Sequence, residues 1–593
     1  MRIALLSLLL LFVLSGCAVN TIQNTRISAN EPLKAGHGAV VVQVVNNTDR
    51  LGTFHQGWTE VIAFRTDNID EIKANAIALA KEKAKSKKEK FDPEKVDWEP
   101  EFYSLTPVNQ GTIDSQLFVG SMPEGKYMIS TLYSFFSNGD MSSWLTMPVM
   151  FSAGRFSVGA NNVSDLGTVV FQPLLSIKEK SFWSNSSQSK AFVTRVEEKQ
   201  KLSDFVLSHY PAIASSLKTD ITLGWEDDGL DSFRGKLSEL SRQNAYSSQA
   251  LRLDGYGVGA LASKFGQLRV LSYDGNWQQL DLPTNSRISA VFEGEQGLHI
   301  GGERGQLFSL VNGDWQVSQP VPPREAIVWF GKGSETNFAL TSSAKQYSAY
   351  TFDQITQQWK RMGAFTRKDP NDWLVQNGGL FPFITQSGGL RILNDNKILD
   401  YNGDTWVTKK GESMRSVAQL ENNVLVGVEV SQWDGVGDQV ISFDDGDSWT
   451  SIWRRLNLFD DSKTDVSLPG YTSTAGVITV GRVKGRNQTK ASDLKILTAP
   501  VESSDDRNGW TAHGDAKDGC YSFLPQLTRE DVLYFLCDQG QIVSTADFGK
   551  TWETEIDVDL SSMTATYEQF VDELVKQAEK EEAEAALDTA EEE

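Results

Sequence analysis

The stretch that decides the fold is Ile288–Pro320, ISAVFEGEQGLHIGGERGQLFSLVNGDWQVSQP. It contains four short strand-like segments, ISAVF, GLHIG, QLFSL and DWQVS, separated by turns rich in glycine and acidic residues. Four strands within about 40 residues make a unit the size of one β-propeller blade. The stretch therefore predicts a blade whose fourth strand begins at Trp315.

The same unit recurs along the second half of the chain. Most of a series of seven tryptophans follow a turn and open a strand-like segment; the series is Trp277, Trp315, Trp359, Trp406, Trp449, Trp510 and Trp552. Successive tryptophans are separated by 38, 44, 47, 43, 61 and 42 residues, which is the spacing of propeller blades. The repeat predicts a seven-bladed β-propeller over residues 250–557.

Two of the turns are sharper than the others: SFDDGDSWT at 442–450 and TADFGKTWE at 545–553. Both fit the pattern [S/T]-x-D-x-G-x-[S/T]-W, which resembles the Asp-box of BNR-type propellers, a family that includes sialidases, sortilin-like receptors and photosystem assembly factors. The resemblance implies two structural turns. The residues it assigns to them are Ser442, Asp444, Gly446 and Trp449 in the first, and Asp547, Gly549 and Trp552 in the second.

The expected role of these residues is local. The aspartate accepts hydrogen bonds within the turn between the third and fourth strands, glycine supplies a positive φ, and tryptophan is buried between blades. A calcium loop is the alternative for the DDGD sequence. It would need oxygen ligands at alternate positions and a distant glutamate, which the residues after Trp449 do not offer. We therefore expect no metal here.

Residues 1–17 form a targeting segment. Arg2 precedes an apolar run from Ile3 to Val13, too short to span a bilayer as a mature helix. The run ends in Leu-Ser-Gly-Cys at residues 14–17, which resembles the lipobox of bacterial lipoproteins. The resemblance implies lipidation of Cys17, with palmitate among the acyl chains, and Ala18 after it implies sorting to the outer membrane. An ordinary signal peptide with a chance cysteine is the alternative.

The rest of the chain is predicted to be a β-sandwich at 35–175, a helical connector at 185–245 and an acidic helical tail at 564–593. The sequence Pro-Glu-Gly-Lys-Tyr at 123–127 resembles the P-x-G-x-Y signature of carboxypeptidase-regulatory or transthyretin-like sandwiches. Leu202, Phe205 and Val206 have helical spacing before Pro211. The lysine-rich segment 71–95 is predicted to be a solvated insertion, and a patch for anionic lipid is the alternative. The fold class is all-β.

Two cysteines remain beyond the targeting segment, Cys520 and Cys537. The bacterial envelope is oxidising, so a disulfide is permitted. The flanking segments, residues 521–524 and 532–535, are predicted to be the two arms of a hairpin, which would bring the cysteines opposite each other. We expect a disulfide; two buried free thiols are the alternative.

Composition and motifs reduce the number of possible functional classes. The net charge of -22 argues against nucleic acid, because no basic stripe exists to replace phosphate counterions. Neither a zinc-protease motif nor a nucleophile elbow occurs, and the five histidines are scattered; no cofactor is expected. A sialidase would need an arginine triad, and the nearest match to its first arginine motif, Phe233-Arg234, lies in the connector. We expect a protein-binding or assembly propeller in the envelope; a glycan-binding or glycoside-hydrolysing surface lipoprotein is the alternative.

Connectivity predicts which end of the propeller binds the partner. The turns between strands one and two and between strands three and four lie at one end of a blade, and all other connections lie at the opposite end. Three long connections are expected at that second end, at 363–378, 431–437 and after Trp449. Their aromatic and arginine residues favour an interface; the alternative is that these side chains anchor their own loops. The candidate partner-binding residues are Trp373, Trp433, Trp453, Arg454, Arg455 and Tyr471.

Overall fold

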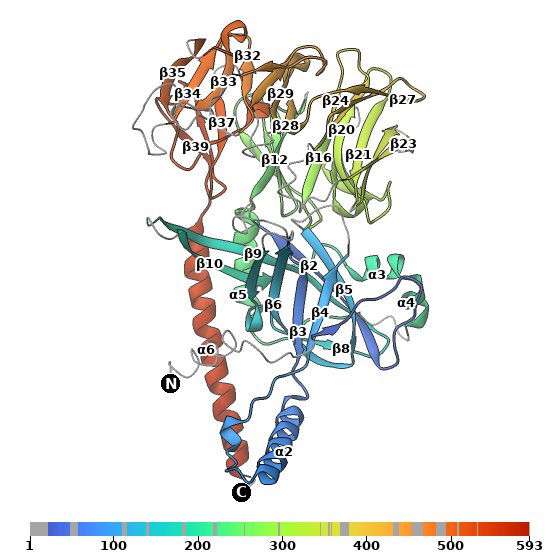
Figure 1. The fold of residues 1–593 in the computed structure, drawn as a ribbon, viewed down its shortest axis with the longest axis vertical. Coiled ribbons are helices and arrows are strands. Elements are labelled where there is room, and N and C mark those ends of the chain that lie inside the picture. Colours follow the sequence, from blue (N-terminus) through green and yellow to red (C-terminus); the bar gives the residue numbers. More distant parts are fainter. Residues whose placement is uncertain are drawn as a thin grey trace.

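The computed structural model describes most of the 593 residues. The described ranges are 22–47, 57–108, 115–137, 142–180, 185–217, 222–253, 255–294, 297–343, 345–353, 356, 358–367, 379–430, 438–452, 467–481, 494–506, 509–529 and 532–591. Figure 1 shows a propeller stacked on an N-terminal β-domain, with a long C-terminal helix running down the side of that domain. The predicted all-β class with a propeller is confirmed.

The N-terminal domain is an eleven-stranded sheet with the order β10-β9-β2-β5-β4-β3-β6-β7, in which β1, β8 and β11 pair with β4, β6 and β9. The strands are β1 (Gln23–Asn24), β2 (His37–Asn46), β3 (Glu60–Arg65), β4 (Phe102–Pro107), β5 (Ser115–Pro123), β6 (Gly125–Ser137), β7 (Ser142–Pro148), β8 (Arg155–Val158), β9 (Val163–Lys180), β10 (Asn185–Arg195) and β11 (Thr222–Leu223).

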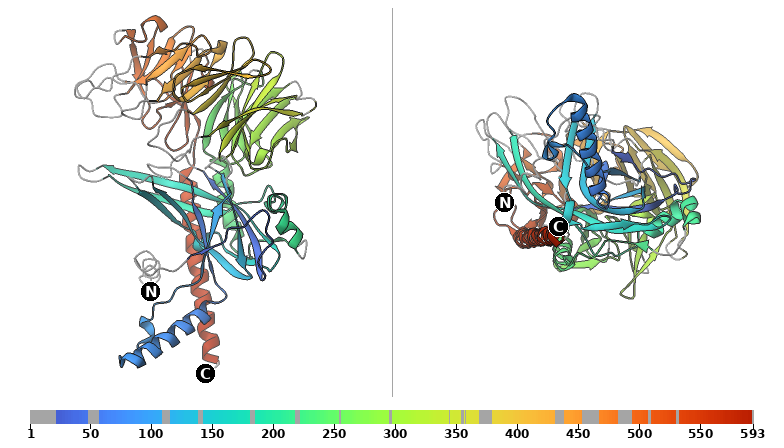
Figure 2. Two further views of the ribbon diagram at one scale, coloured as in Figure 1. Left: turned by 45° about the vertical axis from the view of Figure 1, so that its right-hand side comes forward. Right: turned by 90° about the horizontal axis from the view of Figure 1, so that it is seen from below.

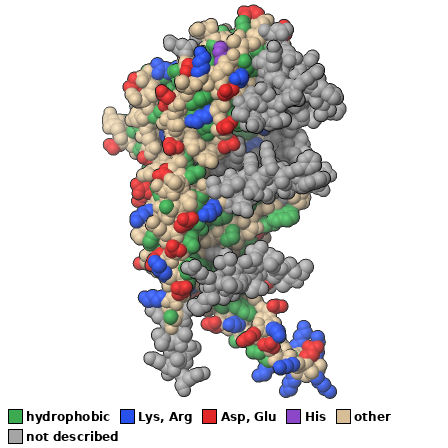
Figure 3. All heavy atoms as spheres, turned by 90° about the vertical axis from the view of Figure 1, so that its left-hand side faces the viewer, with side chains coloured by type: hydrophobic (Ala, Val, Ile, Leu, Met, Phe, Trp, Pro, Cys, Tyr) green, Lys and Arg blue, Asp and Glu red, His purple; other side chains and the backbone are tan. Residues whose placement is uncertain are grey.

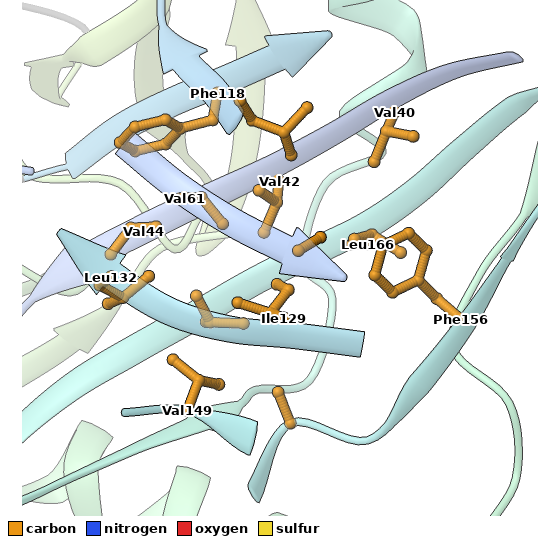
Figure 4. Close-up of a cluster of buried hydrophobic side chains, with 14 of the residues drawn as sticks. Val40, Val42, Val44, Val61, Phe118, Ile129, Leu132, Val149, Phe156 and Leu166 are labelled. Atoms are coloured by element: carbon orange, nitrogen blue, oxygen red, sulfur yellow. The ribbon is translucent and has the colours of Figure 1, made fainter. Parts of the chain in front are cut away.

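The sheet curls around its largest apolar cluster, and a second buried cluster packs residues 202–213 on the other face of β2 and β5. Strand β4 pairs with β3 along most of its length and with β5 at its end, so the two halves of the sheet are hydrogen-bonded into one path. The valines of β2 that point inward face Phe118, Ile129 and Phe156 from other strands, as Figure 4 shows. At the P-x-G-x-Y turn, the Tyr127 hydroxyl donates to the Pro123 carbonyl at 2.8 Å. This bond ties the start of β6 to the end of β5.

The helices differ in part from the prediction. The helical periodicity around Phe205 becomes α3, and Pro211 opens α4 rather than only ending a helix. Residues 185–195, expected in the helical connector, are the strand β10 because they pair along β9 for eleven residues. The helices are α2 (Ile69–Lys87), α3 (Ser203–His209), α4 (Pro211–Ser216), α5 (Asp231–Gln243) and α6 (Leu560–Glu591), with 3-10 turns η1 (Pro93–Lys95), η2 (Met150–Ser152), η3 (Glu303–Gly305), η4 (Glu421–Asn423), η6 (Val501–Ser503) and η8 (Pro525–Leu527).

The propeller has seven sheets of four antiparallel strands, each built from consecutive strands. Blades 1 to 4 are β12 (Ser247–Arg252), β13 (Gly259–Ser263), β14 (Gln267–Leu271) and β15 (Trp277–Asp281); β16 (Ile288–Gly294), β17 (Gly297–Gly302), β18 (Leu307–Val311) and β19 (Asp314–Ser318); β20 (Ala326–Lys332), β21 (Asn337–Ser342), β22 (Gln346–Phe352) and β23 (Trp359–Thr366); and β24 (Leu380–Ile384), β25 (Leu390–Asn394), β26 (Lys397–Tyr401) and β27 (Trp406–Lys410). Blades 5 to 7 are β28 (Met414–Gln419), β29 (Leu425–Glu429), β30 (Gln439–Ser442) and β31 (Thr450–Ser451); β32 (Gly470–Thr472), β33 (Gly476–Gly481), β34 (Lys495–Ala499) and β35 (Thr511–Asp515); and β36 (Ser522–Phe523), β37 (Leu533–Leu536), β38 (Ile542–Thr545) and β39 (Glu553–Ile556).

Every predicted tryptophan lies within one residue of the start of the fourth strand of its blade. The ring closes without exchange of a strand between the first and last blades, because each sheet uses consecutive strands only. Side chains make the closure instead: Leu261 and Leu271 of blade 1 share a buried cluster with Tyr534 of blade 7. The Trp277 and Tyr534 rings meet edge to face at 6.1 Å.

The predicted Cys520–Cys537 disulfide is confirmed. It lies at the base of the hairpin formed by β36 and β37, in which Ser522 faces Leu536. This register differs by one residue from the expected one, because the 3-10 turn η8 occupies the connection between the two strands. The disulfide joins two buried cysteines within the last blade.

The acidic tail begins as part of the folded core. Helix α6 leaves blade 7 and runs down the N-terminal domain, as Figure 1 and the left view of Figure 2 show. Its first half packs on α5 and on β9 and β10 through a stripe of apolar residues, in which Met563 and Phe570 are fully buried. The helix therefore joins the end of the propeller to the domain that precedes the propeller.

Replacing Phe570 with Ala is expected to lower the free energy of unfolding by about 3–5 kcal/mol, the usual cost of emptying a buried phenylalanine site. Urea titration followed by circular dichroism measures this. The matched control is Val571→Ala on the next residue, whose side chain is 37% exposed; it should change the free energy by less than about 0.5 kcal/mol. Equal effects of the two substitutions would contradict the packing role of α6.

Candidate interaction surfaces of the propeller

The two ends of the propeller have different neighbours. Ser286 lies in the connection from blade 1 to blade 2, and Arg304 lies in the turn between β17 and β18. Both contact the N-terminal domain or its following segment, through Gln43 and Gln200 respectively. The N-terminal domain thus packs on the end where the partner site was expected, beneath blades 1 and 2. The turns between third and fourth strands lie at the opposite, uncovered end.

The contact between the two domains is polar and buried. Gln43 Nε2 donates to Ser286 Oγ at 3.1 Å, and Asn285 Nδ2 donates to the Glu197 carbonyl at 2.9 Å. Burial lowers the pKa of Arg304 to about 10, yet the guanidinium donates to Gln200 and to Ser286. Because buried polar groups are costly unless each finds its partner, these bonds favour one orientation of the propeller on the domain.

The two Asp turns, Ser442–Trp449 and Thr545–Trp552, have the local bonding that the sequence predicts. Asp444 accepts bonds from the Ser448 backbone N–H at 2.9 Å and from the Ser448 hydroxyl at 2.6 Å. Asp547 accepts the corresponding bonds from Thr551 at 2.8 and 2.7 Å. Gly446 and Gly549 have φ values of 80° and 87°, where a glycine is favoured.

Each Asp turn also holds two blades together. Trp449 packs among buried residues of blades 4 and 5, and Trp552 among those of blades 6 and 7. The indole N–H of Trp552 donates to the Asp515 carbonyl of the preceding blade at 3.1 Å. Within the described residues, no group of three or more His, Cys, Asp or Glu side chains could hold a metal ion.

Of the six predicted partner-binding residues, Tyr471 alone lies in the described part of the chain. Trp373, Trp433, Trp453, Arg454 and Arg455 lie outside the described residues, as does Cys17. Among the described residues, no helix combines the length and apolar composition needed to cross a membrane.

Tyr471 lies at the opposite end of the propeller from the one expected. It belongs to β32, next to the turn that leads into β33, and its ring meets Phe443 of the first Asp turn at 5.3 Å. The insertion after Trp449 therefore ends before Tyr471, and this side chain is part of the packing between blades 5 and 6.

Arg234, considered as a sialidase arginine, is instead a structural residue. Its side chain is only 2% exposed, and its two terminal nitrogens bind the Asp228 carboxylate at 2.5 and 2.6 Å. The same guanidinium donates to the Phe151 and Ser152 carbonyls of the N-terminal domain. A guanidinium bonded in this way, inside the N-terminal domain, has a structural role.

A cavity of about 830 Å³ lies in the centre of the propeller, lined chiefly by the first strands of blades 1 to 5. Each of these strands pairs on one side only, so the backbone groups of its other edge face the centre. Glycoside hydrolysis uses a pair of carboxylates, and among the described lining residues Glu293 is the one carboxylate. The described part of the lining therefore does not supply such a pair.

The sequence analysis missed a repeated feature of this cavity. A β-bulge interrupts the pairing of the first strand with the second in four of the blades, at Ser248, Ser289, Val328 and Arg415. Bulges re-aim side chains and end regular pairing; the Ser289 hydroxyl, for example, donates to the Ile327 carbonyl of the next blade at 2.7 Å. The sequence signal for a bulge was present in ISAVFEG, where apolar and polar residues do not alternate strictly.

No protein-family model matches the chain, and no curated protein matches it. Solved structures do match, and the three named here do so at low identity. They include YCF48 bound to D1 peptide (14% identity, TM-score 0.30, 46% of this chain and 82% of that chain) and BamB from Moraxella catarrhalis (12% identity, TM-score 0.30, 52% and 99%). The propeller of the Trilobed protease from Pyrococcus furiosus matches with 7% identity, a TM-score of 0.33, and coverage of 53% and 96%. They are similar to this chain in their propeller fold.

The Asp turns are expected to weaken at acidic pH. Hydrogen bonds from Thr551 lower the pKa of Asp547, and those from Ser272 and Asn276 lower that of Asp274. A lowered pKa in the folded state stabilises the fold above the usual value of 3.8, and this is lost as the pH falls through the folded-state pKa. Asp547→Asn should therefore lower the thermal midpoint at pH 7, and its difference from the wild type should shrink below about pH 4.

The measurement is thermal unfolding followed by circular dichroism between pH 7 and pH 2.5. Asp404→Asn, in the corresponding turn of blade 4, changes an exposed aspartate and should leave the midpoint at pH 7 unchanged. A difference between Asp547→Asn and the wild type that stays constant down to pH 2.5 would contradict the role given to the carboxylate.

Proposed function

We propose that the chain is a lipoprotein of the bacterial envelope, anchored to the outer membrane through Cys17, whose propeller is a protein-binding or assembly scaffold. The observation that carries this proposal is the attachment of the propeller to the N-terminal domain at one end of the ring. The N-terminal domain contacts one end of the ring through connections of blades 1 and 2, whereas the long connections at that end belong to blades 3 to 6. A rigidly held ring with long loops beside its mount is suited to present those loops to a partner.

The direction in which the N-terminus leaves the domain supports an anchor. Strand β1 runs parallel to β4, with Gln23 opposite Tyr103. The chain therefore enters the sheet at the end where β3 leads out to α2 and where residues 88–101 lead back into β4. That end faces away from the propeller in Figure 1. Gln23 is six residue steps after Cys17, a distance of about 20 Å in an extended chain. A lipid on Cys17 would hold this end at the membrane and keep the propeller away from it.

We assign the two Asp turns to the BNR repeat class on the same basis. Their serine, threonine and aspartate bonds, their positive-φ glycines and their tryptophans between blades are what that resemblance implies. The role is structural, because the aspartates are fully occupied by donors within their own turns. A protein partner is therefore proposed for the loops at the other end, and not for the Asp turns.

Lipidation can be tested directly. In cells that make the protein, Cys17→Ser should remove incorporation of radioactive palmitate and move the protein from the membrane fraction to the soluble fraction, because stable anchoring requires acyl chains. Cys520→Ser, which alters a cysteine of the disulfide, is the control and should retain the label. Continued palmitate labelling of the Cys17→Ser protein would overturn the anchor.

The scaffold proposal is tested at the long connections. The double variant Trp373→Ala, Trp433→Ala should lose capture of an envelope protein from solubilised membranes while keeping the wild-type thermal midpoint, because tryptophans often carry an interface. Lys550→Glu and Asp404→Lys, exposed residues in turns at the other end, should retain capture. Capture by the folded double tryptophan variant, or its loss in the control variants, would place the site elsewhere.

A further inference from the structure

The hairpin of β6 and β7 presents large aromatic side chains to solvent. Phe135 and Trp144 stand directly opposite each other in the register of this hairpin, and their side chains are 46% and 69% exposed. Leu145 and Met147, on the other face of β7, pack against the core of the domain. The hairpin is thus apolar on both faces, and only the inner face is covered.

Strand β7 is also an edge. Within the described strands it pairs with β6 alone, because β8 takes the other stretch of β6 on the same side. No described strand lies beside the second row of backbone N–H and C=O groups of β7. An exposed edge of this kind is a template for a further strand, unless the sequence protects it.

The sequence leaves this edge without charge, and its one proline, Pro148, is the last residue of the strand. Between Lys126 and Arg155 the only charged residue is Asp140, although 23% of the whole chain is charged and about six charges would be expected. The outermost strands of the blades differ: β15, β19, β23, β27, β35 and β39 each carry at least one charged residue, and β31 is only two residues long. Strand β7, seven residues long, carries none.

The position of the hairpin places it near the propeller. The Ser134 hydroxyl donates to the Gly57 carbonyl at 2.6 Å, and the Trp58 indole donates to Asn46 at 2.7 Å. Asn47, the next residue, donates to the Ser241 carbonyl of α5 at the start of the propeller. The exposed aromatic pair therefore lies toward the propeller end of the domain, opposite the end where the chain enters.

We propose that β7 binds an extended segment of the protein partner, which adds to the sheet as a further strand. This inference rests on the scaffold function and extends it to the N-terminal domain. Backbone hydrogen bonds to the free edge would supply affinity, and apolar side chains at every second position of the segment would pack on Trp144 and Phe135. The segment is expected to be extended, uncharged where it meets β7, and free of proline at the pairing positions.

Two other occupants fit less well. A second copy of this chain would bring two molecules of net charge -22 together, and like charges oppose association. A lipid surface would have to reach the propeller end of the domain, whereas the proposed anchor lies at the opposite end. A partner protein of lower negative charge satisfies both constraints.

The test uses the full-length protein in the cells that make it. The photo-crosslinking residue p-benzoylphenylalanine is placed at position 144, 145 or 146, and the adducts are mapped by mass spectrometry. Positions 144 and 146 point outward and are exposed. They should link to one segment of one protein, at sites two residues apart. Position 145 points inward, and its adducts should stay within the chain. Thr146→Lys, which adds the missing edge charge, should abolish the adduct from position 144.

Thr408→Lys is the matched control, because it makes the same change on β27, an edge strand that already carries Lys409 and Lys410. It should leave the adduct intact. If Thr146→Lys lowers the thermal midpoint, Ser142→Lys on the same exposed face replaces it. Adducts between two β7 strands, adducts to lipid, adducts scattered over several proteins, no adduct at all, or an adduct unaffected by the lysine would each overturn the proposal.

The outcome separates this inference from the scaffold function. Capture through the propeller loops with no ordered adduct at β7 would remove only the strand addition. Ordered adducts at β7 in a protein whose loop tryptophans are dispensable would keep the strand addition and remove the loop site.

Discussion

The propeller depends on the tryptophan that begins the fourth strand of each blade. Trp315, Trp406 and Trp552 each donate their indole N–H to a backbone carbonyl in the fourth strand of the preceding blade. Trp277 repeats this across the closure, where its indole donates to the Glu555 carboxylate of blade 7 at 3.2 Å. The same kind of contact therefore joins three pairs of sequential blades and the first blade to the last, whereas Trp510 donates to the Ser504 carbonyl of its own blade. A large apolar ring with one donor suits this position, since it fills the gap between two sheets and satisfies a carbonyl at their rim.

Because no strand is exchanged at the closure, the two ends of the propeller need another tie. Asn244, just before blade 1, accepts a bond from the Asp559 backbone N–H just after blade 7, at 2.7 Å. From this point α5 and α6 run together with a shared apolar core. The two helices are more than 300 residues apart in the sequence, and their packing stabilises the closed ring. It adds to the direct contact between blades 1 and 7. The acidic tail is part of the propeller's closure as well as a solvated end.

The sequence could predict the features that are local or periodic. The blade unit, the tryptophan positions and the bonding of the Asp turns follow from residues close together in the chain, as does the disulfide at the base of its hairpin. The strand β10 could not be predicted in the same way, because a serine-rich segment becomes a strand only through its pairing with β9. Tyr471 was placed at the wrong end because the length of an insertion does not show where the next strand begins. The buried face of α6 was missed because the segment was judged by its acidic composition. The helical spacing of its apolar residues was present in the sequence, at Met563, Tyr567, Phe570 and Leu574.

The junction between the domains explains why the molecule has a defined shape. An apolar interface of the same size would tolerate small rotations, since dispersion contacts are non-directional. Here Gln43, Asn285 and Arg304 each bond with specific groups across the boundary, and a rotation would leave buried donors unpaired at about 1–3 kcal/mol each. The directional bonds therefore fix which blades lie over the domain and which remain clear of it. Blades 3 to 6 and the apolar edge at β7 consequently keep a constant relation to each other, as one partner that contacts both proposed surfaces requires.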